Sequence, residues 1–564
     1  MPTPTDDALE KAVVIHEKRD SGEVARPPTS DQSTIISEAE VDIGHVFDTP
    51  EQNQPPGLPF SKGRCIAIVA TVTGASFLNT MSGQAVVIIL PTIGRDLDIP
   101  EARVQWVVSA YSLAFGCFLL LWGRIADIYG KRKIFIWGSA WVAVTTVINP
   151  FLPNEIAFDL FRGLQGLGAA ANVPTAIGIL ATTFPPGKAK NYAISCYGGK
   201  HQHPPAGAPL GAVFGNLIAG FIAQYTSWKW VFGVIAIMAA AITVAATAII
   251  PPPKHTLLQE GASVKASVDW IGAFLVTAGL FALLFALTEG NVVGWSTPWV
   301  PVLIVVSLAL VVLFVFWQRH LENTGTRAPI MKVSIFHSKR FSAAMAIMAL
   351  FFSSFNGFLV YATYFFQNYQ GLSPLDTTLR FIPTGVVGVI TAAVVSQLLA
   401  VVPTYMMLAV GNLCVSVACV LFAVPIPPDT TYWAFGLPAM VLSVFGADIT
   451  WPCLILFTSH SLPQEDQALG AALVNAMGQV GRAIGLAVAT AIQTAAMAKE
   501  RGVPVEHVGR IEEWEVASLL GLRGAEWWNA ALGFGALAVV LATFRGSGII
   551  GKVGVPKHQS TVIH

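Results

Sequence analysis

The chain has 564 residues, of which 54% are hydrophobic and only 12% carry a charged side chain. About a quarter of the residues are charged in a typical soluble domain, so this composition excludes an ordinary soluble enzyme and indicates a membrane protein. The net charge is zero, and we expect no nucleic-acid partner. The six cysteines fall mostly in apolar segments without a CxxC pair, so we expect structural thiols and neither a metal nor a cofactor.

The first 62 residues differ in composition from the rest of the chain. They are rich in Pro, Ser, Thr, Asp and Glu and contain few aromatic residues. Such a segment cannot bury enough apolar area to offset chain entropy, so residues 1–62 are predicted to be a disordered cytoplasmic tail. The tail has no short apolar run followed by a cleavage site, so we expect no cleaved signal peptide and assign the insertion signal to the first helix.

Apolar segments long enough to cross a bilayer recur after this tail. We predict an all-α polytopic membrane protein with a six-helix bundle in residues 63–252, two linker helices in 267–318 and a second six-helix bundle in 341–545. A cytoplasmic tail, 546–564, follows. The fourteen segments are expected to centre near residues 78, 115, 143, 172, 214, 239, 278, 307, 351, 386, 413, 445, 480 and 536.

Basic residues in the short loops predict the orientation, because Lys and Arg are retained on the cytoplasmic side. Loops that follow even-numbered segments contain most of them, and most opposite loops are poorer. We therefore predict both termini in the cytoplasm and a location in the plasma membrane, with the vacuolar membrane as the alternative. One late loop on the opposite side departs from this pattern through Lys499, Arg501, Arg510 and Arg523.

The loop after the second segment reads GRIADIYGKRK and contains Gly123, Asp127, Gly130, Lys131 and Arg132. Gly123 and Asp127 are four residues apart and share one helix face. The glycine permits close helix approach, and the carboxylate could accept hydrogen bonds from N–H groups at the start of another helix, which would lock one conformation. The alternative is that the KRK run is only a positive-inside anchor.

This loop resembles the signature loop of the major facilitator superfamily. Residues 64–545 resemble its fourteen-helix drug:proton antiporter family, fungal branch, near the yeast aminotriazole-resistance and boron-export group. The resemblance implies a monomeric transporter that binds a small molecule and protons. Two departures are visible: Ile128 replaces the basic residue that usually follows the aspartate, and the corresponding second-half loop, 396–405, has no charges.

Arg162 and Gln165 lie in FRGLQGLGAAANVP, which resembles the family's fourth-helix motif. The resemblance implies that Arg162 faces the central cavity and takes part in proton coupling. An arginine at membrane depth is costly and is normally paired or functional. The alternative is an interfacial arginine whose long side chain reaches out from the end of the helix.

Gly207, Pro209, Gly211 and Gly215 form a stripe of small residues for close helix packing. The stripe resembles the glycine- and proline-rich motif of antiporters, which favours export over uptake; a generic packing face is the alternative. The preceding GKHQHPP, residues 199–205, interrupts the expected helix start. We interpret it as an insertion or a gene-model error in preference to a metal site.

Asp448 is the only carboxylate that we place well inside a segment, and it is the candidate proton carrier. The alternative is an ion pair with Arg482. The first segment resembles the family's first-helix motif, but an amide replaces its usual acidic residue. Polar side chains expected to line a wet central cavity are Asn79, Gln84, Gln165, Asn475 and Gln479.

These features predict a secondary active transporter and not an enzyme. The leading hypothesis is proton-coupled efflux of a drug, a toxin or a fungal secondary metabolite. A carrier of a small polar solute such as boric acid or ammonium is the alternative. A non-transporting membrane sensor is a remote third, because the N-terminal tail is short for a signalling domain.

Overall fold

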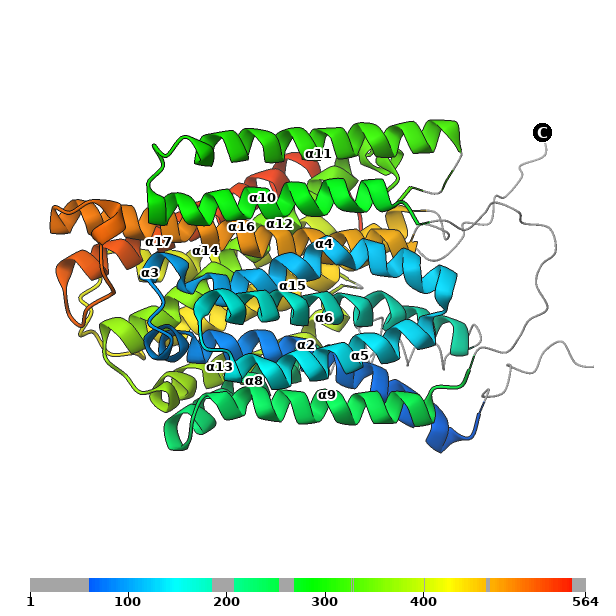
Figure 1. Ribbon diagram of the computed structural model, residues 1–564, viewed down its shortest axis with the longest axis horizontal. Helices are drawn as coiled ribbons and strands as arrows, with labels where there is room; N and C mark the ends of the chain where they lie inside the picture. Colours follow the sequence, from blue (N-terminus) through cyan, green and yellow to red (C-terminus); the bar gives the residue numbers. More distant parts are fainter. Residues whose placement is uncertain are drawn as a thin grey trace, which may run out of the picture. The chain divides into compact units, whose positions relative to one another are not determined.

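The computed structural model describes residues 60–184, 207–252, 268–325, 327, 329–399, 401–462 and 467–549. Fourteen long α-helices occupy these residues, and each corresponds to one of the expected apolar segments (Figure 1). Their bounds are α2 Lys62–Asp96, α4 Trp106–Tyr129, α5 Lys131–Ile148, α6 Glu155–Thr183, α8 Gly207–Tyr225, α9 Lys229–Ile249, α10 Trp270–Val293, α11 Trp299–Thr324, α12 Lys339–Tyr364, α13 Pro374–Leu398, α14 Thr404–Ala423, α15 Gly436–Ser461, α16 Gln467–Arg501 and α17 Val516–Thr543.

Eleven of the helices in the described residues are long and apolar enough to cross a membrane; α6, α8 and α13 are not among them. In α8 only Leu210–Tyr225 is counted as a shorter apolar helix. α6 and α13 contain charged residues within their length, among them Asp159, Arg162 and Arg380. The all-helical prediction is confirmed, and the membrane-spanning role of these three helices stays a prediction.

Helices α2, α4, α5, α6, α8 and α9 pack against one another and form the first helix group. Glycines allow close contacts in it. A Cβ atom at Gly211 would lie 2.4 Å from the carbonyl oxygen of Phe77, and one at Gly166 would lie 2.3 Å from that of Tyr111. The small-residue stripe of α8 therefore packs directly on the backbone of α2. Gly207 and Pro209 begin α8, but their side chains lie outside the described part, as do residues 199–205.

Helices α12 to α17 form the second helix group, and α10 and α11 form the linker pair. In the second group, a Cβ atom at Gly481 of α16 would lie 2.3 Å from the carbonyl oxygen of Ala349 in α12. Asp269 caps α10 and accepts hydrogen bonds from Trp317 and Gln318 of α11, which holds the linker pair together. α10 packs on α4 and α16, and the two groups meet where α16 contacts α4 and α13 contacts α8.

Local sequence explains where several helices begin and end. The side chain of Asn154 caps α6, and the side chain of Ser373 caps α13 directly before a proline. Between α4 and α5, Gly130 has φ +100° and ψ 124°, a conformation that residues with a Cβ atom rarely adopt. α12 ends in a π-helical turn, η4, Phe365–Tyr369. Such turns are common at functional sites.

Candidate functional site

Arg162 of α6 lies at the centre of a buried hydrogen-bond network in the first group. Its side chain is 1% exposed; Nε donates to the carbonyl oxygen of Val107 at 2.9 Å, and Nη1 donates to Gln165. Gln165 in turn donates to Ser82 of α2 at 3.1 Å. The guanidinium carbon lies 4.9 Å from the centre of the Tyr111 ring. The alternative that Arg162 extends from a helix end to the interface is wrong, because polar and aromatic partners on α4, α6 and α9 enclose it.

A second arginine, Arg482 of α16, approaches the same place from the second group. Its guanidinium carbon lies 5.3 Å from the centre of the Phe352 ring, and its Nε is buried without a hydrogen-bond partner among the described residues. Tyr111 interacts electrostatically with both Arg162 and Arg482. The buried guanidinium of Arg162 and the half-buried guanidinium of Arg482 therefore both lie near Tyr111, where the two helix groups meet.

The polar residues predicted to line a central cavity lie on three helices, α2, α6 and α16. Asn79 and Gln84 are half-buried on α2, and Nδ2 of Asn79 has no partner among the described residues. Asn475 donates to a carbonyl oxygen of its own helix, α16. The Gln479 Cβ atom would lie only 3.0 Å from a Cβ atom at Gly116, so α4 and α16 touch there. Gln165 is fully buried, so in this conformation it supports Arg162 and lines no open space.

Polar contacts join the two groups at the end of the helices near Asp98, which we call the Asp98 end. Arg510 donates to Oδ1 of Asp98 at 2.6 Å and to the carbonyl oxygen of Gly94 at 3.4 Å. Beside it, Gln493 donates to the buried Glu101 of the short helix α3, Glu101–Val104, at 3.3 Å. Gln367 of η4 donates to the carbonyl oxygen of Ile88 at 2.7 Å.

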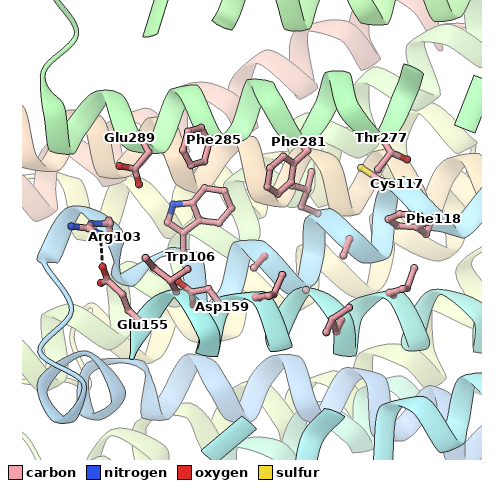
Figure 2. A pocket seen from close by; sticks show the side chains of 18 residues that line it. Arg103, Trp106, Cys117, Phe118, Glu155, Asp159, Thr277, Phe281, Phe285 and Glu289 are labelled. Atoms are coloured by element: carbon pink, nitrogen blue, oxygen red, sulfur yellow. Dashed lines mark hydrogen bonds and ion pairs between the residues drawn. The ribbon is translucent and has the colours of Figure 1, made fainter. Parts of the chain in front are cut away.

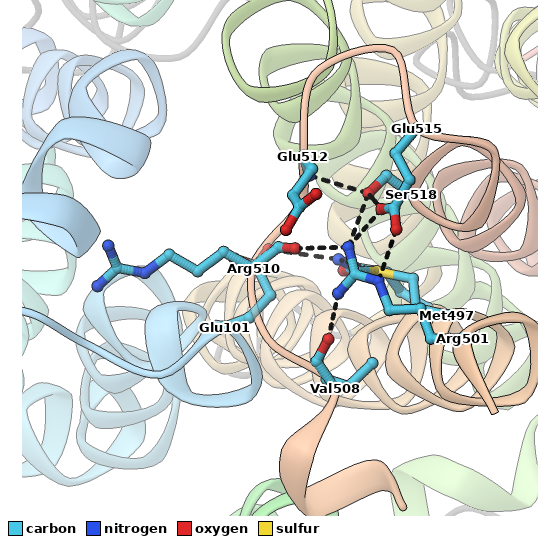
Figure 3. Close-up of polar contacts among 9 residues, drawn as sticks. Glu101, Met497, Arg501, Val508, Arg510, Glu512, Glu515 and Ser518 are labelled. Carbon is cyan, nitrogen blue, oxygen red and sulfur yellow. Dashed lines mark hydrogen bonds and ion pairs between the residues drawn. The ribbon is translucent and has the colours of Figure 1, made fainter. Parts of the chain in front are cut away.

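The loop between α16 and α17 holds Arg510 in position. Arg501 donates to the carbonyl oxygens of Val508 and Arg510 and forms an ion pair with Glu515. This hydrogen bond from Arg501 lowers the pKa of Glu515. Figure 3 shows the Arg501 guanidinium enclosed by the loop, while the Arg510 side chain extends away from it. This arrangement was not predicted from the sequence; its signal was the unusual number of basic residues in a loop expected to have few.

The loop Gly123–Arg132 lies at the opposite end, which we call the Asp127 end. The carboxylate of Asp127, in the last turn of α4, forms an ion pair at 3.5 Å with Lys131, the first residue of α5. Arg132 donates to the carbonyl oxygens of Ile250 and Thr247 at 2.7 and 2.8 Å, at the C-terminal end of α9. The expected hydrogen bonds from backbone N–H groups to Asp127 are absent among the described residues; Asp127 instead pairs with the side chain of Lys131, the first residue of α5. Arg132 of the KRK run therefore ties α5 to α9.

Ile128, which replaces the basic residue usual in this loop, has an apolar role. It packs against a cluster formed by Leu121 of α4, Val268 and Ala273 at the start of α10, and Ile330. An exposed basic side chain would gain nothing from this contact, whereas an isoleucine buries apolar area. The departure from the family pattern thus coincides with the presence of the linker pair.

Asp448 lies on α15 with its Oδ2 atom buried and without a hydrogen-bond partner among the described residues. No ion pair between Asp448 and Arg482 is present in the part of the chain that the structure describes. The prediction of a single carboxylate well inside a segment is wrong, because Glu526 of α17 is 2% exposed and bonds Asn529 at 3.2 Å. The last segment was expected to centre near residue 536, but α17 begins at Val516 and so includes Glu526 in its interior.

Known proteins are similar to this chain over most of its length. Residues 72–331 and 270–486 match the family model described as Major Facilitator Superfamily. The low affinity ammonium transporter of Saccharomyces cerevisiae is 30% identical, over 72% of this chain and 77% of its own. The efflux pump terJ of Aspergillus terreus is 27% identical over 85% and 87%. The major facilitator superfamily multidrug transporter mdr3 of Aspergillus fumigatus is 28% identical over 93% and 88%.

Solved structures share the fold. The crystal structure of the POT family transporter PepTSo aligns with a TM-score of 0.61 at 14% identity, over 87% of this chain and 99% of that one. The human organic anion transporter MFSD10 aligns with a TM-score of 0.55 at 14% identity, over 86% and 100%. At this identity the similarity concerns the fold alone.

Proposed function

Because the chain belongs to the major facilitator superfamily, whose members are transporters and not enzymes, we propose that it exports a small organic molecule in exchange for protons. Relatives named as an efflux pump and a multidrug transporter support export, and so does the glycine stripe of α8. The candidate substrates are drugs, toxins and fungal secondary metabolites. The observation that carries the proposal is the position of the buried Arg162 and Tyr111 beside the half-buried Arg482, where the two helix groups meet.

In this proposal the two helix groups, residues 63–252 and 341–545, move against each other and expose a central site to one side at a time. The Asp98–Arg510 contact closes one end. At the other end, the charges of the Asp127 loop pair within the first group and leave the second group free to separate from it. With both termini in the cytoplasm of a monomeric plasma-membrane protein, the closed end is the extracellular one.

Arg162 and Asp448 are the proposed proton-coupling residues. Arg162 is positioned by neutral partners, so its charge is available to a substrate or a carboxylate that changes protonation. Asp448 has an unpaired buried oxygen. A carboxyl group in such surroundings is stable when protonated, and it can release the proton when the groups move and water enters.

Purified protein in proteoliposomes tests this function. After an imposed pH jump, we expect ethidium or aminotriazole to move with an opposite proton flux that a pH-sensitive dye reports. Arg162→Gln should abolish both movements. Asp448→Asn should abolish proton flux while substrate exchange without a gradient continues. Asp429→Asn, at an exposed loop position, is the matched control. Substrate movement that is indifferent to the pH gradient would contradict the coupling.

A second candidate function is transport of a small polar solute. It is favoured by the 30% identity to a relative named as a low affinity ammonium transporter. The same proteoliposomes distinguish the two functions: radiolabelled methylammonium or boric acid would move, and ethidium would not.

A further inference from the structure

A groove between α4, α6 and α10 lies outside the interface between the two helix groups (Figure 2). Its volume is 540 Å³, within the range of about 300–1,000 Å³ that is typical for small-molecule sites. All of its lining residues belong to the first group and to one linker helix, and none belongs to the second group. It is therefore separate from the central site proposed above.

Acidic side chains line the groove near the Asp98 end. Glu155 forms an ion pair with Arg103, but its Oε2 atom is buried without a partner. Asp159, one turn further along α6, has a buried Oδ1 atom without a hydrogen-bond partner among the described residues, and it interacts electrostatically with Arg103 and Arg162. Glu289 faces them from α10, as Figure 2 shows. The described lining thus has three carboxylates and a single cation, Arg103.

Aromatic rings cover the wall beside these carboxylates. The rings of Trp106 and Phe285 lie 6.5 Å apart, and Phe285 stacks on Phe281 at 6.4 Å. Trp106 comes from α4 and the two phenylalanines from α10, so the wall exists only because the linker helix packs here. An aromatic face attracts a cation through its quadrupole, and this attraction is strongest for tryptophan.

The rim of the groove is apolar and exposed. Ile156 and Leu160 of α6 line it with 72% and 62% of their surface exposed. On a helix of a membrane protein, exposed apolar side chains face lipid. A ligand dissolved in the bilayer can therefore reach the groove laterally, without entering the central site.

We infer that this groove is a binding site for a lipophilic organic cation. The apolar and aromatic walls accept the hydrophobic body of the ligand, and the carboxylates of Asp159 and Glu289 compensate its charge. An excess of carboxylates over cations in the lining disfavours an anion. The inference goes beyond the proposed function, because binding here requires neither a proton gradient nor movement of the helix groups.

Equilibrium binding of radiolabelled tetraphenylphosphonium to the purified full-length protein tests the site. Tetraphenylborate has the same shape and the opposite charge, so it serves as the matched competitor. We expect saturable binding of the phosphonium that tetraphenylborate does not displace. The double variant Asp159→Asn, Glu289→Gln should weaken binding by at least about tenfold, because the counter-charges are lost. Asp429→Asn should leave it unchanged.

A steric variant tests the same site with its charges intact. A Cβ atom at Gly163, which lines the groove, would have only the carbonyl oxygen of Ala110 nearby, at 3.8 Å. Gly163→Leu should therefore fold and fill the groove, and it should weaken phosphonium binding as well. Unchanged affinity in both variants, or equal displacement by tetraphenylborate, would overturn the assignment. Displacement by phosphatidylcholine at concentrations below those of the phosphonium would reassign the groove to lipid.

Discussion

The two ends of the helices use their charges in different ways. At the Asp98 end, Arg510 of the second group pairs with Asp98 of the first, and the side chains are 40% and 96% exposed. At the Asp127 end, Asp127 pairs with Lys131, four residues along the same chain segment, and Arg132 binds carbonyl oxygens of α9. The Asp98 end therefore joins the two groups through this exposed ion pair and through the buried Gln493–Glu101 and Gln367–Ile88 hydrogen bonds, while the Asp127 end stabilises the first group internally.

This difference indicates which parts can move. An exposed ion pair between groups costs little to break, because water replaces each partner. Contacts within a group are kept when the group moves as a unit. The structure is thus suited to open at the Asp98 end without disturbing either helix group, and the following predictions test that asymmetry.

The largest effect is expected from joining the groups permanently at the Asp98 end. In a background without the native cysteines, Asp98→Cys and Arg510→Cys bridged by a short bifunctional thiol reagent should reduce substrate transport by at least about tenfold, because alternating access requires this end to separate. A reducible reagent should restore activity after reduction. Glu512→Cys with Ser518→Cys, bridged inside the second group, is the control. Undiminished transport by the bridged Asp98–Arg510 protein would show that this end does not open.

At the Asp127 end, Gly130→Ala should destabilise the protein. The φ of +100° at Gly130 is unfavourable for any residue with a Cβ atom, and the expected loss in the free energy of unfolding is about 1–3 kcal/mol. Thermal unfolding in detergent measures it. Gly63→Ala, at an exposed helical position with nothing within 4 Å of its Cβ, should leave the melting temperature nearly unchanged. Equal effects of the two substitutions would contradict a specific backbone requirement in this loop.

Breaking the Asp98–Arg510 contact should have a smaller effect. Asp98 has φ +51°, which asparagine also tolerates, so Asp98→Asn removes the charge and keeps the backbone. The lost ion pair contributes at most about 1 kcal/mol. Its loss therefore shifts the equilibrium between the closed and open states of the Asp98 end roughly fivefold. Reactivity of a cysteine introduced at Arg95 should rise accordingly. Asp429→Asn should not change it, and an equal rise in both variants would rule out a specific contact.

The smallest effect concerns the loop that holds Arg510. The Arg501 hydrogen bond keeps the pKa of Glu515 below its usual value, so this stabilisation is present above the unfolded pKa and is lost as the pH falls through the folded pKa. Glu515→Gln should lower the melting temperature slightly at pH 7, and this difference should shrink as the pH falls below about 4.3 and disappear below the folded pKa of Glu515. Glu500→Gln, an exposed neighbour, is the control. A pH-independent difference would show that the charge of Glu515 is unimportant.

Much of the fold follows from local sequence, because an apolar run long enough to cross a bilayer determines its own helix. The fourteen helices appear near the expected centres, and Arg162 was identified from its position among glycines. Helix boundaries are harder to predict, because charged residues can extend a helix beyond its apolar run. Glu526 was missed for this reason. Helix α17 begins at Val516, well before the apolar run that was used to predict it.

The contacts between the groups could not be predicted in the same way. Asp98 and Arg510 are 412 residues apart, and neither lies in a recognisable motif. Their pairing depends on the loop around Arg501, and the acidic groove depends on where the linker pair packs. Ile128 differs from these contacts, because the sequence alone shows that a basic residue is missing there. The structure adds the explanation, which is the packing of Ile128 against Val268 and Ala273.

Distances across both ends, measured by pulsed electron spin resonance, test the central claim most directly. One spin-label pair replaces the exposed residues Arg95 and Glu512 beside the Asp98–Arg510 contact, and a second replaces Lys133 and Ser461 at the Asp127 end. On adding a transported substrate or changing the pH, the first distance should lengthen in the population in which the second shortens. Two distances that stay constant under transport conditions, or that lengthen together, would contradict alternating access by the two helix groups.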